Sequence, residues 1–127
     1  MFDYEKEKVR TNLLERRYKT LAKLVTHDFQ KDTLSDTVII YGAGVIGTEL
    51  YQRIKNYTKV KCFIDKNKAG ETFDNIEIIS VDKLQHESKT KIIVSATYDL
   101  ENIKSKLYGK YCDEDIISLD DILGLTI

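Results

Sequence analysis

A glycine-rich turn between an apolar run and a helical pattern constrains this chain more than any other feature. The segment VIIYGAGVIGTELYQRI covers residues 38–54 and places Gly42, Gly44 and Gly47 in the spacing G-x-G-x-x-G. The continuous apolar run before the glycines is typical of a strand buried on both faces. The apolar residues after them recur every three or four positions, as on one face of a helix.

In a strand–turn–helix unit of this kind, each of the three positions favours glycine for a different physical reason. The first permits the tight turn that leaves the strand, and the second lets a phosphate approach the backbone because it has no Cβ. The third lets the helix pack close to the strand. The free N–H groups and the positive end of the helix then point at the anion. The turn therefore predicts a phosphate-binding site, unless it is only a turn in a fold whose site is empty or vestigial.

An acidic residue follows at the position that such a site requires. Asp65 ends the second predicted strand, KVKCFID at residues 59–65, and its carboxylate can accept hydrogen bonds from the hydroxyls of a ribose. Lys66 and Lys68 come directly after it and suit a 2′-phosphate. Because the Asp65 carboxylate would repel that phosphate, NAD is favoured over NADP.

Strands and helices alternate along the rest of the chain. Strands are predicted at residues 37–41, 59–65, 76–79, 91–96 and 115–119, with helices after the glycine turn, around residues 81–86 and at 99–110. The helix after the turn is expected to bury Ile46, Leu50, Ile54 and Tyr57. This pattern predicts an α/β fold, a three-layer Rossmann-like parallel sheet of about five strands in the order 3-2-1-4-5. The nucleotide-binding domain spans residues 37–127 and follows an extra N-terminal helix within residues 1–30.

The end of the fourth predicted strand forms the expected far side of the site. In the order 3-2-1-4-5 the switch point lies between the first and fourth strands. Ser95, Ala96 and Thr97 are therefore expected to face the glycine turn across a crevice. Ser95 and Thr97 can donate to phosphate or ribose oxygens. Alternatively, Thr97 and Asp99 cap the next helix, which is the favoured role for Asp99.

The N-terminal segment is charged, lacks glycine and is predicted to be a helix over residues 3–29. Its apolar stripe consists of Leu14, Tyr18, Leu21 and Val25, spaced by four, three and four residues. Such a stripe must be covered, either by a second copy in a homodimer or by packing against the chain's own sheet.

Composition narrows the class of partners. Hydrophobic residues make up 42% and charged residues 32%, and the net charge of −1 gives no reason to expect nucleic acid or a membrane surface. No apolar run approaches the roughly 20 residues that span a bilayer, and no secretion signal is evident, so a cytoplasmic location is expected. Cys62 lies in an apolar alternation and reads as a buried side chain, and neither it nor Cys112 belongs to a CxxC motif. No metal site is predicted.

No complete catalytic set is evident. Tyr51 and Lys55 have the spacing of the tyrosine–lysine pair of short-chain dehydrogenases, but they lie on the helix directly after the glycine turn rather than on a later helix. We therefore assign no catalytic residue and leave enzymatic activity open. Any dehydrogenase or dehydratase reaction would need a catalytic partner chain or a second copy.

The segments IIYGAGVIGTELYQRI and KVKCFIDKNKAGETFDNIEIISVDKL resemble a known group of proteins. They are similar to the small Rossmann modules of bacterial surface-polysaccharide enzymes, namely the NAD-binding part of nucleotide-sugar dehydratases and dehydrogenases. They also resemble the N-terminal, UDP-sugar-binding domain of sialic-acid-type sugar acyltransferases, whose usual histidine is replaced here by Val45-Ile46. The resemblance implies nucleotide contacts from these residues: Gly42, Ala43, Gly44, Val45, Ile46, Asp65, Lys66 and Ser95 to Thr97.

The sequence thus predicts a module that binds a small nucleotide, NAD(H) first, linked to nucleotide-sugar or surface-polysaccharide metabolism. Two alternatives stay open. One is a UDP-sugar-binding module without dehydrogenase activity, and the other is a regulatory or scaffold protein with a degenerate site.

Overall fold

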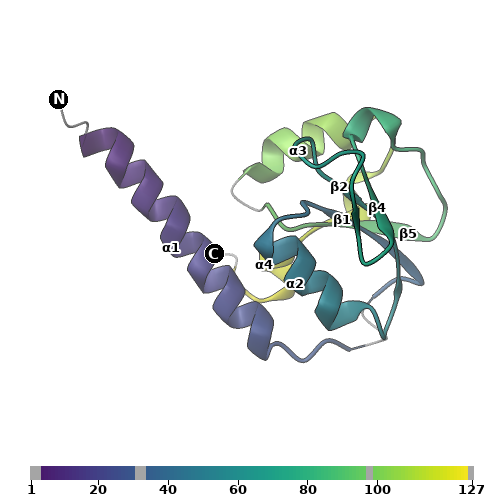
Figure 1. Cartoon of the computed structure of the whole chain (residues 1–127), viewed down its shortest axis with the longest axis horizontal. Coiled ribbons are helices and arrows are strands. Elements are labelled where there is room, and N and C mark those ends of the chain that lie inside the picture. Colours follow the sequence, from purple (N-terminus) through teal and green to yellow (C-terminus); the bar gives the residue numbers. More distant parts are fainter. Residues whose placement is uncertain (1–3, 31–33, 97–98, 126–127) are drawn as a thin grey trace.

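A six-stranded sheet forms the centre of the molecule, and helices lie on both of its faces (Figure 1). The computed structural model describes residues 4–30, 34–96 and 99–125. The strands are β1 (Thr37–Tyr41), β2 (Lys59–Ile64), β3 (Thr72–Phe73), β4 (Ile76–Ile79), β5 (Thr90–Val94) and β6 (Ile116–Ser118). The helices are α1 (Tyr4–Thr26), α2 (Val45–Ile54), α3 (Leu100–Leu107) and α4 (Leu119–Ile122), with short 3-10 helices at Val81–Lys83 and Asp113–Asp115.

The strand order is β3-β4-β2-β1-β5-β6, which differs from the predicted five-strand order 3-2-1-4-5. The additional strand β3 pairs antiparallel with β4 at the edge of the sheet, whereas the other neighbouring pairs are parallel. A tight turn at Asp74 and Asn75, with φ of 51° and 64°, joins β3 to β4. The prediction missed β3 because two residues are too few to show an alternating pattern.

The central strand β1 supports both layers of the core. It lies between β2 and β5, and its neighbouring side chains point to opposite faces of the sheet. Val38 and Ile40 join the cluster beneath α1, α2 and α4, while Ile39 joins the cluster beneath α3. The continuous apolar run of this strand is therefore explained by burial on both faces.

The helix after the glycine turn packs as expected at three of the four predicted positions and not at the fourth. Leu50 and Ile54 are fully buried, and Ile46 is partly buried against the same cluster. Tyr57 was predicted to be inward, but it is 44% exposed. The reason is that α2 ends at Ile54, so Tyr57 lies beyond the helix and no longer shares its inner face.

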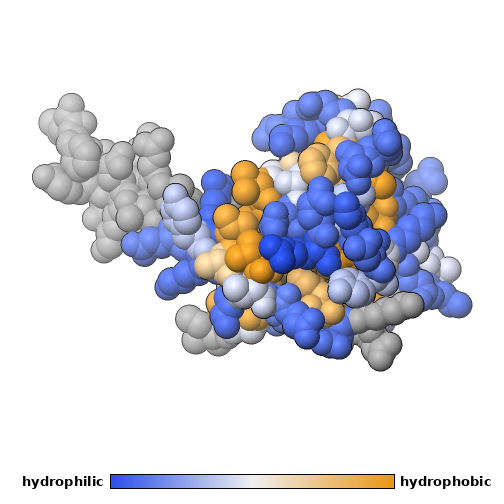
Figure 2. All heavy atoms as spheres, turned by 60° about the horizontal axis from the view of Figure 1, so that its bottom comes forward, coloured by the Kyte–Doolittle hydropathy of each residue, from blue (hydrophilic) through white to orange (hydrophobic). Residues whose placement is uncertain are grey.

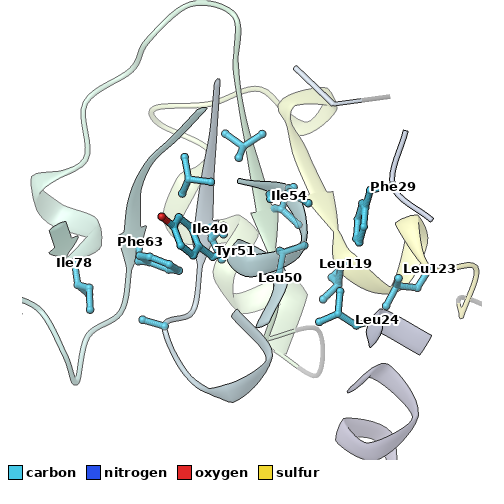
Figure 3. Close-up of a cluster of buried hydrophobic side chains, with 14 residues drawn as sticks. Leu24, Phe29, Ile40, Leu50, Tyr51, Ile54, Phe63, Ile78, Leu119 and Leu123 are labelled. Carbon is cyan, nitrogen blue, oxygen red and sulfur yellow. The ribbon is translucent and has the colours of Figure 1, made fainter. Parts of the chain in front are cut away.

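The side of α1 that packs against the rest of the chain matches the predicted apolar stripe only in part. Tyr18 and Val25 are 72% and 39% exposed, whereas Thr20 and Leu24 are buried. Figure 3 shows Leu24 close to Leu119 and Leu123, which belong to α4 and the residue that follows it. Leu21 is half-buried, and the Leu14 side chain lies outside the described residues.

A buried carboxylate on α4 explains why a polar face of α1 turns inward. Asp120 is only 4% exposed, and its Oδ1 accepts a hydrogen bond of 3.0 Å from Thr20 Oγ1. Its Oδ2 accepts one of 3.3 Å from Arg16 Nη2. These bonds fasten the C-terminal half of α1 to its own module, while the N-terminal half extends away from the sheet (Figure 1). A homodimer through α1 stays a prediction.

Replacing Asp120 by alanine is expected to loosen α1 and to lower the free energy of unfolding by about 1–3 kcal/mol, because Thr20 then loses a buried partner. Thermal unfolding and limited proteolysis within α1 would measure both effects. Asp113→Ala is the matched control: that carboxylate pairs with Lys104 but is 68% exposed, so its loss should cost at most about 1 kcal/mol. Equal stability of the two variants would contradict the role given to Asp120.

Candidate functional site

Two glycines of the turn are required by the fold itself. Gly42 has a φ of 110°, and a Cβ there would lie 2.4 Å from Ser95 Oγ. At Gly47 a Cβ would lie 1.9 Å from the backbone oxygen of Gly42, so only glycine lets α2 approach the end of β1 this closely. Gly42 thus allows the tight turn out of the strand, and Gly47 allows the close approach of the helix, as the sequence predicts.

The packing of the protein does not require glycine at the middle position of the turn. Gly44 has φ −84° and ψ −159°, a region that other residues adopt, and no described atom lies within 4 Å of the position of a Cβ there. It precedes the first turn of α2 but has no side chain to cap it, and no acidic residue lies in that turn. The first N–H groups of a helix have no partners within the helix. At Gly44 no side chain blocks access to these N–H groups.

Asp65 lies beside the turn, and its carboxylate already accepts hydrogen bonds from the backbone. Its Oδ2 accepts a hydrogen bond of 2.9 Å from the N–H of Ala43, and its Oδ1 accepts bonds from the N–H groups of Asn67 and Lys68 at 2.9 and 3.3 Å. Lys68 Nζ donates to the Ala43 carbonyl at 2.9 Å. Asp65 therefore holds the glycine turn against the end of β2, a role that the sequence did not reveal. Contact with a ribose remains a prediction.

Asp65→Ala is expected to lower the free energy of unfolding by about 2–3 kcal/mol, because backbone N–H groups in a half-buried turn lose a charged acceptor. Chemical denaturation would measure the change. Asp65→Asn should cost less, since its amide oxygen still accepts one set of these bonds. If the alanine variant matched the wild type, the described hydrogen bonds would not stabilise the turn.

A pocket of about 400 Å³ opens beside the glycine turn, between α1 and the carboxyl ends of the central strands. Most residues predicted for the site line it: Gly42, Gly44, Val45, Ile46, Gly47, Asp65, Ser95 and Ala96. Ala43 is buried, Lys66 is exposed and does not line the pocket, and Thr97 lies outside the described residues. The structure thus brings the glycine turn and the end of β5 to one cavity.

The second wall of the pocket was missed by the sequence analysis. It comes from α1 and consists of these residues: Arg16, Arg17, Tyr18, Thr20 and Leu21. Tyr18 and Leu21 belong to the predicted apolar stripe, but apolar periodicity gives no weight to the arginines and Thr20 beside them. For these polar residues the only signal in the sequence was the arginine pair.

At the far side of the pocket, the Ser95 hydroxyl is hydrogen-bonded to the backbone. Its side chain is buried, and its Oγ donates to the carbonyl oxygen of Tyr41 at 2.8 Å. Burial raises the pKa of Tyr41, and the negative charges of Asp99 and Asp65 raise it further. Tyr41 is therefore protonated at neutral pH. Ser95 joins the end of β5 to the end of β1 here, and its contact with a ligand oxygen stays a prediction.

The pair Tyr51 and Lys55 has a structural role. Tyr51 is buried in the core, and its hydroxyl donates to Asp74 Oδ2 at 2.5 Å, which raises the pKa of the phenol. Lys55 Nζ lies 5.8 Å from the centre of the Tyr51 ring. Tyr51 thus joins α2 to the β3–β4 turn, and Lys55 lies directly after that helix.

Three further features bear on the chemistry of the chain. Burial raises the pKa of the Cys62 thiol to about 11, so this thiol is protonated and shielded at neutral pH. Within the described ranges, no group of three or more His, Cys, Asp or Glu side chains is arranged to hold a metal ion. No helix in the same part of the chain is both long and apolar enough to cross a membrane.

The fold and the site define an α/β protein with a glycine turn that opens into a pocket at the carboxyl ends of its parallel strands. Residues 34–122 match the family described as C2185-like, N-terminal, and the chain belongs to that family. The matched range begins after α1, so this helix adds a pocket wall from outside it. No curated protein and no solved structure matches the chain.

Proposed function

We propose that this protein is a Rossmann-like module that binds a nucleotide, with a phosphate at the first turn of α2 and NAD(H) as the first candidate. The observation that carries the proposal is the open space at Gly44. The fold requires glycine at positions 42 and 47, but it does not require glycine at position 44. At helix N-caps, Ser, Thr, Asp and Asn bond the first N–H groups with their side chains, whereas glycine, which is also common there, leaves these groups accessible. A phosphate that binds these same N–H groups explains why no side chain is there.

The rim of the pocket supports a ligand with an organic part rather than a bare phosphate. Tyr18 and Val45 both line the pocket, and both are 72% exposed. Figure 2 shows apolar surface gathered where α1 leaves the body of the molecule. Exposed apolar side chains beside anion donors suit a base or sugar attached to the phosphate.

The surroundings of Asp65 favour NAD over NADP. The carboxylate would repel a 2′-phosphate, and the ammonium group of Lys68, the nearest cation in sequence after Lys66, donates to the Ala43 carbonyl. The resemblance of residues 37–119 to surface-polysaccharide modules supports a link to nucleotide-sugar metabolism. A catalytic partner chain would then act on the bound nucleotide.

A UDP-sugar is the second candidate, and the size of the pocket favours it. The volume of about 400 Å³ is near the lower end of the roughly 300–1,000 Å³ of small-molecule sites, because α1 borders the cavity. A ligand with one nucleoside fits such a space more easily than a dinucleotide. Both candidates place a phosphate at Gly44 and differ in what extends beyond it.

A thermal-shift panel tests the proposed function. NAD, NADH, NADP, UDP, a UDP-sugar, AMP and coenzyme A would each be added to the full chain. A ligand at 100 times its dissociation constant should stabilise the fold by about 2.7 kcal/mol, which raises Tm by roughly 10 °C. A shift with NAD supports the first candidate, and a shift with the UDP-sugar supports the second. If no nucleotide at millimolar concentration changes Tm, the proposal is wrong and a degenerate site is favoured.

A further inference from the structure

We propose that α1 completes the phosphate site, and that Arg16 and Arg17 select ligands with a diphosphate over those with a single phosphate. This inference rests on the proposed function and names the chemical class of its ligand. One phosphate would lie at the first turn of α2, and the neighbouring phosphate would lie between that turn and the two guanidinium groups. The bound class is then a nucleoside diphosphate or a derivative of one.

The arrangement of charges in the pocket supports this assignment. The two arginines and Gly44 line the same cavity, from helices that pack side by side. The lining contains two guanidinium groups and one carboxylate, that of Asp65, whose oxygens already accept backbone hydrogen bonds. Of the two guanidinium groups, that of Arg16 also pairs with the buried carboxylate of Asp120. A guanidinium group presents its donors in a planar fork that matches two phosphate oxygens.

The anchor of α1 fixes where this charge lies. Asp120 accepts hydrogen bonds from Thr20 Oγ1 and Arg16 Nη2 at 3.0 and 3.3 Å, so it sets the rotation of the helix. One nitrogen of Arg16 is used in this bond, while its side chain remains 52% exposed and has other donors for a ligand. Asp120 is thus a positioning residue for Arg16.

Both arginines lie on α1, outside the range that matches the family. Residues 34–122 contain the glycine turn and Asp65, whereas α1 ends at Thr26. The module alone would supply the site for one phosphate. The second phosphate would be recognised only because α1 packs across the pocket.

The test compares ligands that differ by one phosphate. Calorimetry would give the dissociation constants of AMP, ADP, UMP and UDP for the full chain, and the ratio of monophosphate to diphosphate constants measures the selectivity. We expect the diphosphates to bind at least about tenfold more tightly, and Arg17→Gln to remove most of that ratio. Arg17→Lys keeps the charge but not the fork and should retain part of it.

Two further variants keep the result interpretable. Arg16→Gln should also lower the ratio, but it takes a partner from Asp120 and is read only if the variant is folded by circular dichroism. Arg53→Gln is the matched control, since Arg53 pairs with Glu49 and lies at the other end of α2 from Gly44. This control should keep the wild-type ratio.

The outcomes separate this inference from the proposed function. If the wild type binds nucleotides but Arg17→Gln and folded Arg16→Gln keep its selectivity, the role of α1 is wrong and the site at Gly44 stands. If the wild type binds AMP and ADP equally, the diphosphate assignment is also wrong. If it binds no nucleotide at all, both proposals fail together.

Discussion

Gly47→Ala is expected to destabilise the protein by about 3 kcal/mol or more, a large part of the 5–15 kcal/mol that usually holds a domain folded. The added methyl group would lie 1.9 Å from the carbonyl oxygen of Gly42 and 2.8 Å from its carbon. Both atoms belong to the backbone, so no side chain can rotate away. Instead, α2 would have to move off the end of β1, and that movement would open the core around Leu50. Urea denaturation followed by circular dichroism measures the loss.

Gly109→Ala provides the control for this prediction. Gly109 has no positive φ, and no described atom lies within 4 Å of the position of a Cβ there. Its replacement should therefore change the free energy of unfolding by no more than about 0.5 kcal/mol. If Gly47→Ala and Gly109→Ala unfolded at the same urea concentration, α2 would not approach the end of β1 as closely as described.

Gly44→Asp is expected to lower nucleotide affinity by at least about 100-fold while leaving the fold intact or slightly more stable. An aspartate at this position can cap the first turn of α2, and its negative charge favours the helix N-terminus, which together should add a few tenths of a kcal/mol. The same carboxylate would occupy the phosphate position and repel the ligand. Tm without ligand and the dissociation constant of the best ligand of the thermal-shift panel measure the two effects.

Gly44→Asn separates charge from size. Asparagine caps a helix about as well as aspartate and has nearly the same volume, but it carries no charge. Its affinity should fall between those of the wild type and Gly44→Asp. Wild-type affinity in Gly44→Asp would show that no phosphate binds at this turn. A large loss of stability in both variants would contradict the open space at Gly44.

The sheet and the turn were predictable because their signals are local. The run Val38 to Ile40 is apolar at every position, and a strand covered on both faces buries three successive side chains. The spacing of the three glycines has a meaning once a strand precedes them and a helix follows. By contrast, the strand β3 is set by a turn at Asp74 and Asn75, where both residues have positive φ, and two residues carry no pattern of their own.

The second wall of the pocket was not predictable because it depends on one long-range contact. Apolar spacing predicted a stripe of α1 that contains Tyr18 and Val25, but the contact with α4 is made by Thr20 and Arg16, which bond the buried carboxylate of Asp120. These partners are about a hundred positions apart in the sequence. The local role of Asp65 was hidden for a similar reason, since a carboxylate at the end of a strand looks the same whether it binds a ribose or the N–H of Ala43.

The central claim is that the first turn of α2 binds the phosphate of a nucleotide, and an amide NMR titration tests it most directly. NAD and a UDP-sugar would be added in steps to the labelled full chain. The account predicts that the amide signals of Gly44, Val45, Ile46 and Gly47 move most and reach a plateau together. Saturable shifts elsewhere in the chain, with these four signals unmoved, would contradict it.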